Sequence, residues 1–139
     1  MAIHPGEKIG DYEVLSQLGY GGIGEVYKVR HVISQRVEAL KLLRSDRIGD
    51  ELSERFLREI RLLAGLSHPH IARLHTAFQA DGQVAMVMEF IEGEDLHWKM
   101  HSPWPARAVE GIEYIRQVLS ALEYAALHKW HESALEKQG

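Results

Sequence analysis

A run of closely spaced glycines between two strand-like segments constrains the fold of this chain more than any other feature. Residues 18–26 read Leu-Gly-Tyr-Gly-Gly-Ile-Gly-Glu-Val, which fits the pattern G-x-G-x-x-G-x-V. A dinucleotide-binding fingerprint would need a helix after the glycines, and a Walker loop would need Gly-Lys followed by Ser or Thr. A valine- and tyrosine-rich segment, 26–32, follows instead. Two interpretations remain: a plain tight hairpin, and a loop whose backbone approaches phosphate groups.

Most of the first ninety residues have the patterns of strands. Strands are predicted over 12–18, 26–32, 37–43, 71–78 and 84–90. The pair Asp81-Gly82 between the last two is a strong signal for a tight turn, so we expect antiparallel neighbours.

One helix interrupts these strands. Between Ser53 and Leu66 the apolar residues recur three or four positions apart, which is the spacing of a helical stripe. Ser53 is the predicted N-cap, and Gly65 followed by Pro69 closes the segment.

The last third of the chain is predicted to be helical. A short helix is expected over 96–100 and a long helix over 106–130, with Pro105 well placed near the start of the long helix. The chain is therefore an α+β protein, which we divide into residues 1–92, with the strands and one helix, and residues 93–139, with two helices and a polar tail.

The composition excludes several classes of protein. The chain has 139 residues, of which 45% are hydrophobic and 26% charged, and its formal net charge is -4. The chain therefore lacks the excess of basic residues that is typical of nucleic-acid-binding proteins. It has no cysteine, which rules out disulfides and thiolate metal sites. With no apolar run near the roughly 20 residues that cross a bilayer and no signal-peptide pattern, we expect a cytoplasmic chain without a membrane segment.

Lys41 is the first candidate binding residue outside the glycine run. Period-two alternation places Val37, Ala39 and Lys41 on one face of the predicted strand 37–43. A flat ring could lie on the small Ala39 while the Lys41 ammonium reaches phosphate oxygens. The alternative is a lysine on a solvated strand face.

Glu59 is the second candidate. It lies at the edge of the helical stripe, three residues after Phe56 and one before Ile60. A carboxylate turned inward there needs a cationic partner, because burying an unpaired charge is costly. Lys41 is the partner we predict, and a local pair with Arg55 is the alternative.

These features occur in the order found in one protein family. Together with Val-Met-Glu-Phe-Ile-Glu-Gly at 87–93 and Leu-Ser-His-Pro-His-Ile at 66–71, they make residues 9–130 resemble the first half of a bacterial-type serine/threonine protein kinase. The resemblance implies a small lobe with a five-stranded antiparallel sheet and one helix, the αC helix. A hinge, a short helix and a long αE-like helix follow.

The resemblance also implies an adenine-nucleotide site. The residues that it assigns to this site are Leu18, Gly19, Gly21, Gly22, Gly24, Val26, Ala39, Lys41, Glu59, Met88, Glu89 and Ile91. In the family, the apolar ones cover the adenine, Met88 stands at the gatekeeper position, and backbone groups near Glu89 and Ile91 meet the adenine edge. One departure is Glu38, which replaces an apolar residue and is predicted to lie on an exposed face.

The catalytic half of the family pattern is missing from these residues. A kinase needs a catalytic-loop aspartate, and an asparagine and a further aspartate that hold magnesium. Here the last aspartate is Asp95, and the chain has no asparagine. We therefore predict no catalytic residue, no phosphate transfer by these residues alone, weak ATP binding, and magnesium only through the nucleotide.

The nine histidines do not predict a metal site. His97 and His101 are four apart and His128 and His131 three apart, but no third ligand accompanies either pair. The three tryptophans are interpreted as packing residues.

Three functions remain open. The first is a truncated kinase domain that keeps the ATP-binding half. The second is a pseudokinase-like interaction module with weak or no nucleotide binding, and the third is a structural protein. The helix 106–130 is apolar most of the way round, which predicts a homodimer through paired or exchanged helices.

Overall fold

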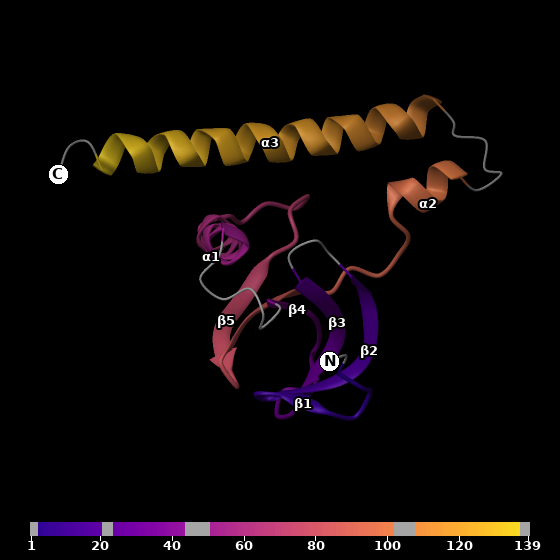
Figure 1. Ribbon diagram of the computed structural model, residues 1–139. Helices are drawn as coiled ribbons and strands as arrows, with labels where there is room; N and C mark the ends of the chain where they lie inside the picture. Colours follow the sequence, from indigo (N-terminus) through magenta and orange to yellow (C-terminus); the bar gives the residue numbers. More distant parts are fainter. Residues whose placement is uncertain (1–2, 21–23, 44–50, 102–107, 137–139) are drawn as a thin grey trace. The chain divides into compact units, whose positions relative to one another are not determined.

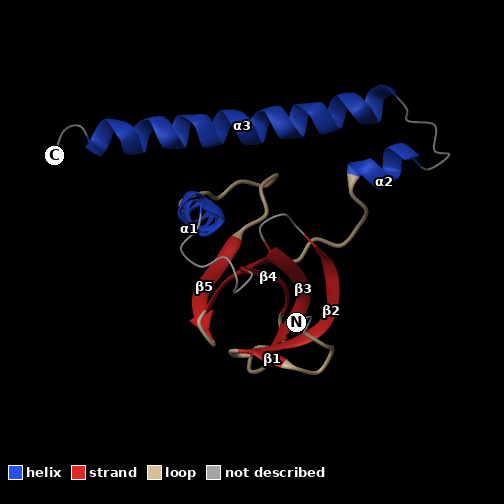
Figure 2. Ribbon diagram, viewed as in Figure 1, coloured by secondary structure: helices blue, strands red, loops and turns tan. Residues whose placement is uncertain are grey.

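The chain forms two compact units (Figure 1). The computed structural model describes residues 3–20, 24–43, 51–101 and 108–136. Residues 1–65 with 72–91 make the first unit, and residues 66–71 with 92–139 make the second. The first unit contains all the strands and one helix, and the second contains two helices (Figure 2).

The first unit is built on a six-stranded antiparallel sheet with the strand order β1-β2-β3-β4-β6-β5. Its strands are β1 (Lys8–Ile9), β2 (Tyr12–Tyr20), β3 (Gly24–His31), β4 (Val37–Leu43), β5 (Leu74–Ala80) and β6 (Gln83–Glu89). The five predicted strands are all present, although β5 begins three residues later than expected. The sequence did not predict β1, because two residues are too few to show a periodicity.

The sheet curls, and one of its faces encloses a core (Figure 2). This core consists of Ile9, Tyr12, Val14, Tyr27, Val29, Leu40, Leu42, Ala85 and Val87. The tight turn at Asp81-Gly82 is confirmed: both residues have positive φ, 50° and 76°, as a two-residue hairpin of the primed type requires.

Helix α1 (Glu51–Ala64) packs on the other face of the sheet. Phe56 is fully buried there with Leu43 and Met86, and Ile60 and Leu63 pack against them. The prediction that Ser53 caps the helix is wrong, because α1 begins at Glu51 and Ser53 is buried inside its first turn. Acidic residues at Glu51 and Glu54 complement the helix dipole in that turn.

The buried carboxylate of Glu38 is the main departure from the sequence analysis. The prediction that Glu38 faces solvent is wrong, because its side chain is 0% exposed. The same alternation that turns Lys41 to one face turns Glu38 to the other, beside Leu40 and Leu42 of the enclosed core. The partners that make this burial tolerable come from elsewhere in the chain and are described below.

The second unit contains α2 (Leu96–His101) and α3 (Ala108–Glu136). The segment 66–71 is held to α3, since the Ser67 N–H donates to the Tyr124 hydroxyl at 3.0 Å and the His68 ring lies 3.1 Å from the Ser120 hydroxyl. Trp98 on α2 was interpreted as a packing residue, and this is wrong because it is 70% exposed. In the described part of the chain, no helix is long and apolar enough to cross a membrane.

Candidate functional site

Three strands of the first unit bring three of the predicted site residues into one row, and β6 extends this row. Gly19 of β2 lies opposite Val26 of β3, Val26 opposite Lys41 of β4, and Lys41 opposite Met86 of β6. Residues directly opposite each other in an antiparallel sheet point to the same face. The glycine segment and Lys41, which are about twenty residues apart in the sequence, therefore share one face of the sheet.

The neighbouring row adds Ala39 and Met88. These two residues lie opposite each other across β4 and β6, one alternation away from Lys41. Met88 also packs against the cluster formed by Leu43, Phe56 and Met86. The small side chain of Ala39 thus lies beside Lys41 on the site face, as the alternation predicts.

Lys41 and Glu59 form the polar centre of the site. The Lys41 Nζ donates to both carboxylate oxygens of Glu59, at 3.1 and 3.0 Å. The two side chains are 19% and 34% exposed, so the pair is largely shielded from solvent but still in contact with it. Of the two partners predicted for Glu59, the structure shows Lys41.

Packing of α1 explains how this pair forms. Phe56 lies one helical turn before Glu59 and is buried against the sheet, so it fixes the rotation of α1. The Lys41 Nζ also lies 5.7 Å from the centre of the Phe56 ring, within the range of a cation–π contact. The helix stripe thus presents Glu59 to Lys41.

The glycines of the loop have different structural roles. A Cβ on Gly24 would lie 2.1 Å from the Leu42 carbonyl oxygen, so β3 can approach β4 only with glycine there. A Cβ on Gly19 would have no atom within 4 Å, so the fold itself does not require glycine at this position. Gly21 and Gly22 lie outside the described residues.

Leu18 and the hinge residues stand at the edges of the row. Leu18 is the extra residue at a register shift in β2 and is 47% exposed. Glu89 ends β6, and its N–H donates to the Arg73 carbonyl at 2.8 Å. Ile91 follows in the connection after β6 and is 65% exposed. Because the Glu89 N–H already donates to Arg73, only the Glu89 carbonyl is left for the predicted contact with the adenine edge.

A buried tyrosine stabilises the strand that follows the glycines. The Tyr27 hydroxyl donates to the Glu25 carboxylate at 2.5 Å and accepts from the Ile3 N–H at 3.2 Å. Burial, together with the hydrogen bond to Glu25, raises the pKa of Tyr27 to about 12. The hydroxyl therefore keeps its proton at neutral pH and ties the N-terminal segment to β3.

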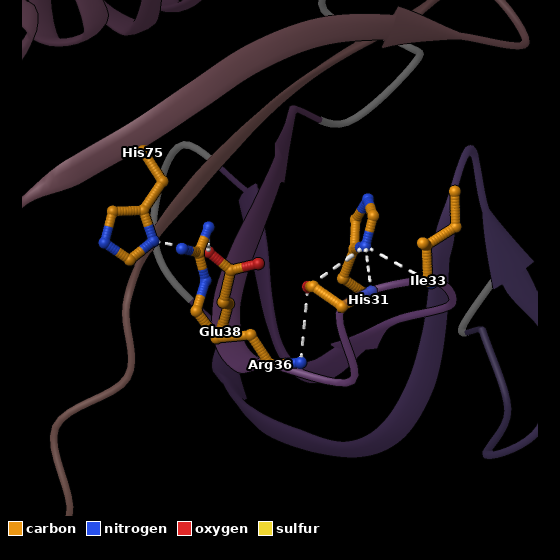
Figure 3. Close-up of polar contacts among 6 residues, drawn as sticks. His31, Ile33, Arg36, Glu38 and His75 are labelled. Carbon is orange, nitrogen blue, oxygen red and sulfur yellow. Dashed lines mark hydrogen bonds and ion pairs between the residues drawn. The ribbon is translucent and has the colours of Figure 1, made fainter.

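One polar cluster was missed by the sequence analysis. Glu38 of β4 forms an ion pair with Arg36, just before the strand, and accepts a hydrogen bond from His75 of β5 (Figure 3). The signal was available in part, because the alternation puts Glu38 with Leu40 and Leu42. Nothing in the local pattern identifies His75 as its partner.

Of the two histidine pairs, the structure describes the side chains of His97, His101 and His128, whereas His131 lies outside the described side chains. The rings of His97 and His101 lie 4.4 Å apart between centroids, and His128 stacks near Tyr124. Among the side chains that the structure describes, in residues 3–20, 24–43, 51–101 and 108–129, no group of three or more His, Cys, Asp or Glu is placed to hold a metal ion.

Comparison with known proteins agrees with this geometry. The model of the protein kinase domain matches residues 12–131, which is most of the chain, and the chain belongs to the protein kinase family. It is 38% identical over 128 residues to the serine/threonine-protein kinase PknF of Mycobacterium tuberculosis. It is 35% identical over 116 residues to the serine/threonine-protein kinase pkn3 of Myxococcus xanthus.

Solved structures give the same fold. The kinase domain of M. tuberculosis PknI superposes with a TM-score of 0.72 at 34% sequence identity, over 89% of this chain and 51% of that one. The alignments cover 90% of this chain and 27% of PknF, and 82% of this chain and 21% of pkn3. The chain thus spans about half of a solved kinase domain and about a quarter of the curated relatives.

Proposed function

We propose that these residues form the nucleotide-binding half of a serine/threonine protein kinase domain and that they bind ATP. The observation that carries this proposal is the Lys41–Glu59 pair, with both carboxylate oxygens of Glu59 within 3.1 Å of the Lys41 Nζ. In kinases, such a pair holds the lysine against the nucleotide phosphates. The Lys41 side chain is 19% exposed, so its ammonium can still meet a phosphate.

The neighbouring residues supply the other parts of such a site. Gly19 stands in the same row as Lys41 and has open space where a side chain would be, so a phosphate could approach its backbone. Leu18, Val26 and Ala39 offer an apolar surface for one face of the adenine ring. The Glu89 carbonyl and the Ile91 backbone would meet the adenine edge.

The proposed activity of these residues is binding rather than transfer. No aspartate follows Asp95, and no asparagine is present to hold magnesium, so magnesium would arrive only with the nucleotide. The second apolar face of the adenine site, which kinases take from the large lobe, is also missing from these residues. Its loss should cost about 2 kcal/mol, or roughly thirtyfold in affinity. We therefore expect ATP to bind in the high micromolar range or more weakly.

Amide chemical shifts of the ¹⁵N-labelled 139-residue chain would locate the bound nucleotide. On titration with magnesium-ATP, we expect shifts at Gly19, Lys41 and Ile91, because the phosphates and the adenine would contact these backbones. Tripolyphosphate is the matched control, and it should move Gly19 and Lys41 but not Ile91. Shifts confined to α2 and α3, or none at millimolar ATP, would contradict the proposal.

A second proposal concerns α3, because its exposed apolar residues lie in several directions. The exposed apolar side chains are Val109, Ile112, Ile115, Val118, Leu119, Leu122 and Leu127, each between 52% and 76% exposed. So much apolar surface favours association in water. We propose that the 139-residue chain forms a homodimer through α3, by pairing these helices or by exchanging them. Because this apolar surface favours association, it supports a non-catalytic interaction module as the second candidate function.

Sedimentation equilibrium at tens of micromolar protein tests this association. We expect the mass of a dimer for the wild-type chain and of a monomer for Leu119→Glu, since a charge on the apolar face opposes pairing. Glu123→Gln on the same helix is the control and should remain a dimer. A wild-type chain that sediments as a monomer would show that α3 is no self-association surface.

A further inference from the structure

The buried Glu38 carboxylate joins three parts of the first unit. It comes from β4, its first partner Arg36 precedes that strand, and its second partner His75 comes from β5 (Figure 3). Both partners contact the same oxygen, Oε1, and the Arg36 contact measures 2.9 Å. Among the described residues, the other oxygen, Oε2, has no hydrogen-bond partner. A buried carboxylate needs such partners, because burying an unpaired charge is costly.

The contact with His75 crosses an intervening strand. In the sheet, β6 lies between β4 and β5. Glu38 is directly opposite Glu89, the last residue of β6, and its side chain reaches beyond that strand to His75. The contact therefore links β4 to β5 beside Glu89, the last residue of β6.

A β-bulge places His75 for this contact. Leu74 pairs with Met88 and Thr76 pairs with Val87, so two steps along β5 correspond to one step along β6. His75 is the extra residue between them. Bulges turn a side chain away from the direction that the regular pleat would give it.

The same end of β5 also holds Glu89. The Glu89 N–H donates to the Arg73 carbonyl at 2.8 Å, and the Arg73 N–H donates to the Glu89 carboxylate at 3.2 Å. Arg73 is two residues before His75. A displacement of the bulge would therefore act directly on the residue from which the connection 90–93 leaves the sheet.

Further neighbours of Glu38 are Glu89, which lies directly opposite on β6, and Tyr12. Tyr12 is buried in the same core and stacks on Phe78 of β5, with ring centroids 5.7 Å apart. Burial raises the pKa of Tyr12, and the negative charge of Glu38 raises it further. Among the described residues, Arg36 and His75 are the two groups whose contacts with the Glu38 carboxylate the structure shows.

We propose that Glu38 is a positioning residue: through His75 it fixes the bulge of β5 and thereby holds Glu89 and the connection 90–93 in place. Glu38 does not touch the nucleotide site itself, because its side chain points to the opposite face of β4 from Lys41. The consequence for base selectivity rests on the proposed function, since it requires that the connection 90–93 contact a purine.

Hydrogen exchange of the Glu89 amide tests the link without any nucleotide. In His75→Ala we expect this amide to exchange about tenfold faster relative to the Val14 amide of β2, because a hydrogen bond to a charged group is lost. His75→Asn should restore most of the protection, since its side-chain N–H can take the position of Nδ1. Arg36→Ala is the matched control: it removes the other partner of Oε1, and it should change the ratio by less than about twofold.

Three results would overturn the proposal. The first is an unchanged Glu89-to-Val14 ratio in His75→Ala. The second is an equal acceleration of both amides, which would show a general loss of stability. The third is an effect of Arg36→Ala as large as that of His75→Ala, which would show that neutralising Glu38 matters and the tie to β5 does not.

Base selectivity provides the second readout. We expect the preference for ATP over GTP to fall at least about threefold in His75→Ala, because the base contact loosens while the triphosphate contacts remain. An unchanged preference, together with normal ATP affinity, would contradict the positioning role. If the wild-type chain bound neither nucleotide, the proposed function would fail, and the exchange ratio would still decide the role of Glu38.

Discussion

Gly24→Ala should destabilise the first unit by about 3 kcal/mol or more, whereas Gly19→Ala should leave its stability almost unchanged. The two glycines belong to the same motif, and their surroundings differ. An added Cβ at Gly24 would lie 2.1 Å from the Leu42 carbonyl oxygen, which belongs to the backbone of β4 and cannot rotate away. At Gly19 the Cβ would enter open space.

Gly19→Ala should instead weaken ATP binding, although it leaves stability almost unchanged. If a phosphate approaches the backbone there, the added methyl group should weaken ATP binding about tenfold although the fold is intact. Urea denaturation gives the free energies of unfolding, and calorimetry gives the affinities. A Gly24→Ala chain within about 1 kcal/mol of the wild type would show that the close approach of β3 to β4 is not required.

Much of the site could be predicted because its residues act through local patterns. The alternation along β4 puts Ala39 and Lys41 on one face, and the stripe of α1 puts Glu59 at its edge. An inward-pointing glutamate needs a cation, and Lys41 was the partner predicted for it, with Arg55 as the alternative. The structure confirms this contact at 3.0 Å.

The rest depends on interactions between distant residues that no local pattern shows. Glu38 was predicted to face solvent, as charged residues usually do. The alternation along β4, however, puts Glu38 on the same face as the core residue Leu40. Its burial depends on His75, and the orientation of His75 depends on an extra residue in β5. A bulge of this kind changes the register by one residue and leaves no periodicity in the sequence. The strand β1 was missed for a related reason, since its two residues are defined only by their pairing with β2.

Lys41→Met should abolish measurable ATP binding, and this is the second large effect that we expect. The substitution removes the ammonium that would meet the phosphates, and hydrogen bonds between charged groups are among the strongest that a binding site makes. Met retains much of the apolar stem, so packing beside Phe56 and Met86 should persist. Glu59 then loses its partner but remains about one-third exposed, so the cost to stability should be small.

Calorimetric titration of ATP into the wild-type chain, Lys41→Met and the control Lys8→Met tests the central claim most directly, since Lys8 is an exposed residue of β1. We predict binding in the high micromolar range for the wild type and for Lys8→Met. For Lys41→Met we predict a loss of at least about tenfold, which places binding beyond detection. Equal ATP affinity in the wild type and Lys41→Met, or no binding by the wild type at millimolar ATP, would contradict the claim that these residues form a nucleotide site around Lys41 and Glu59.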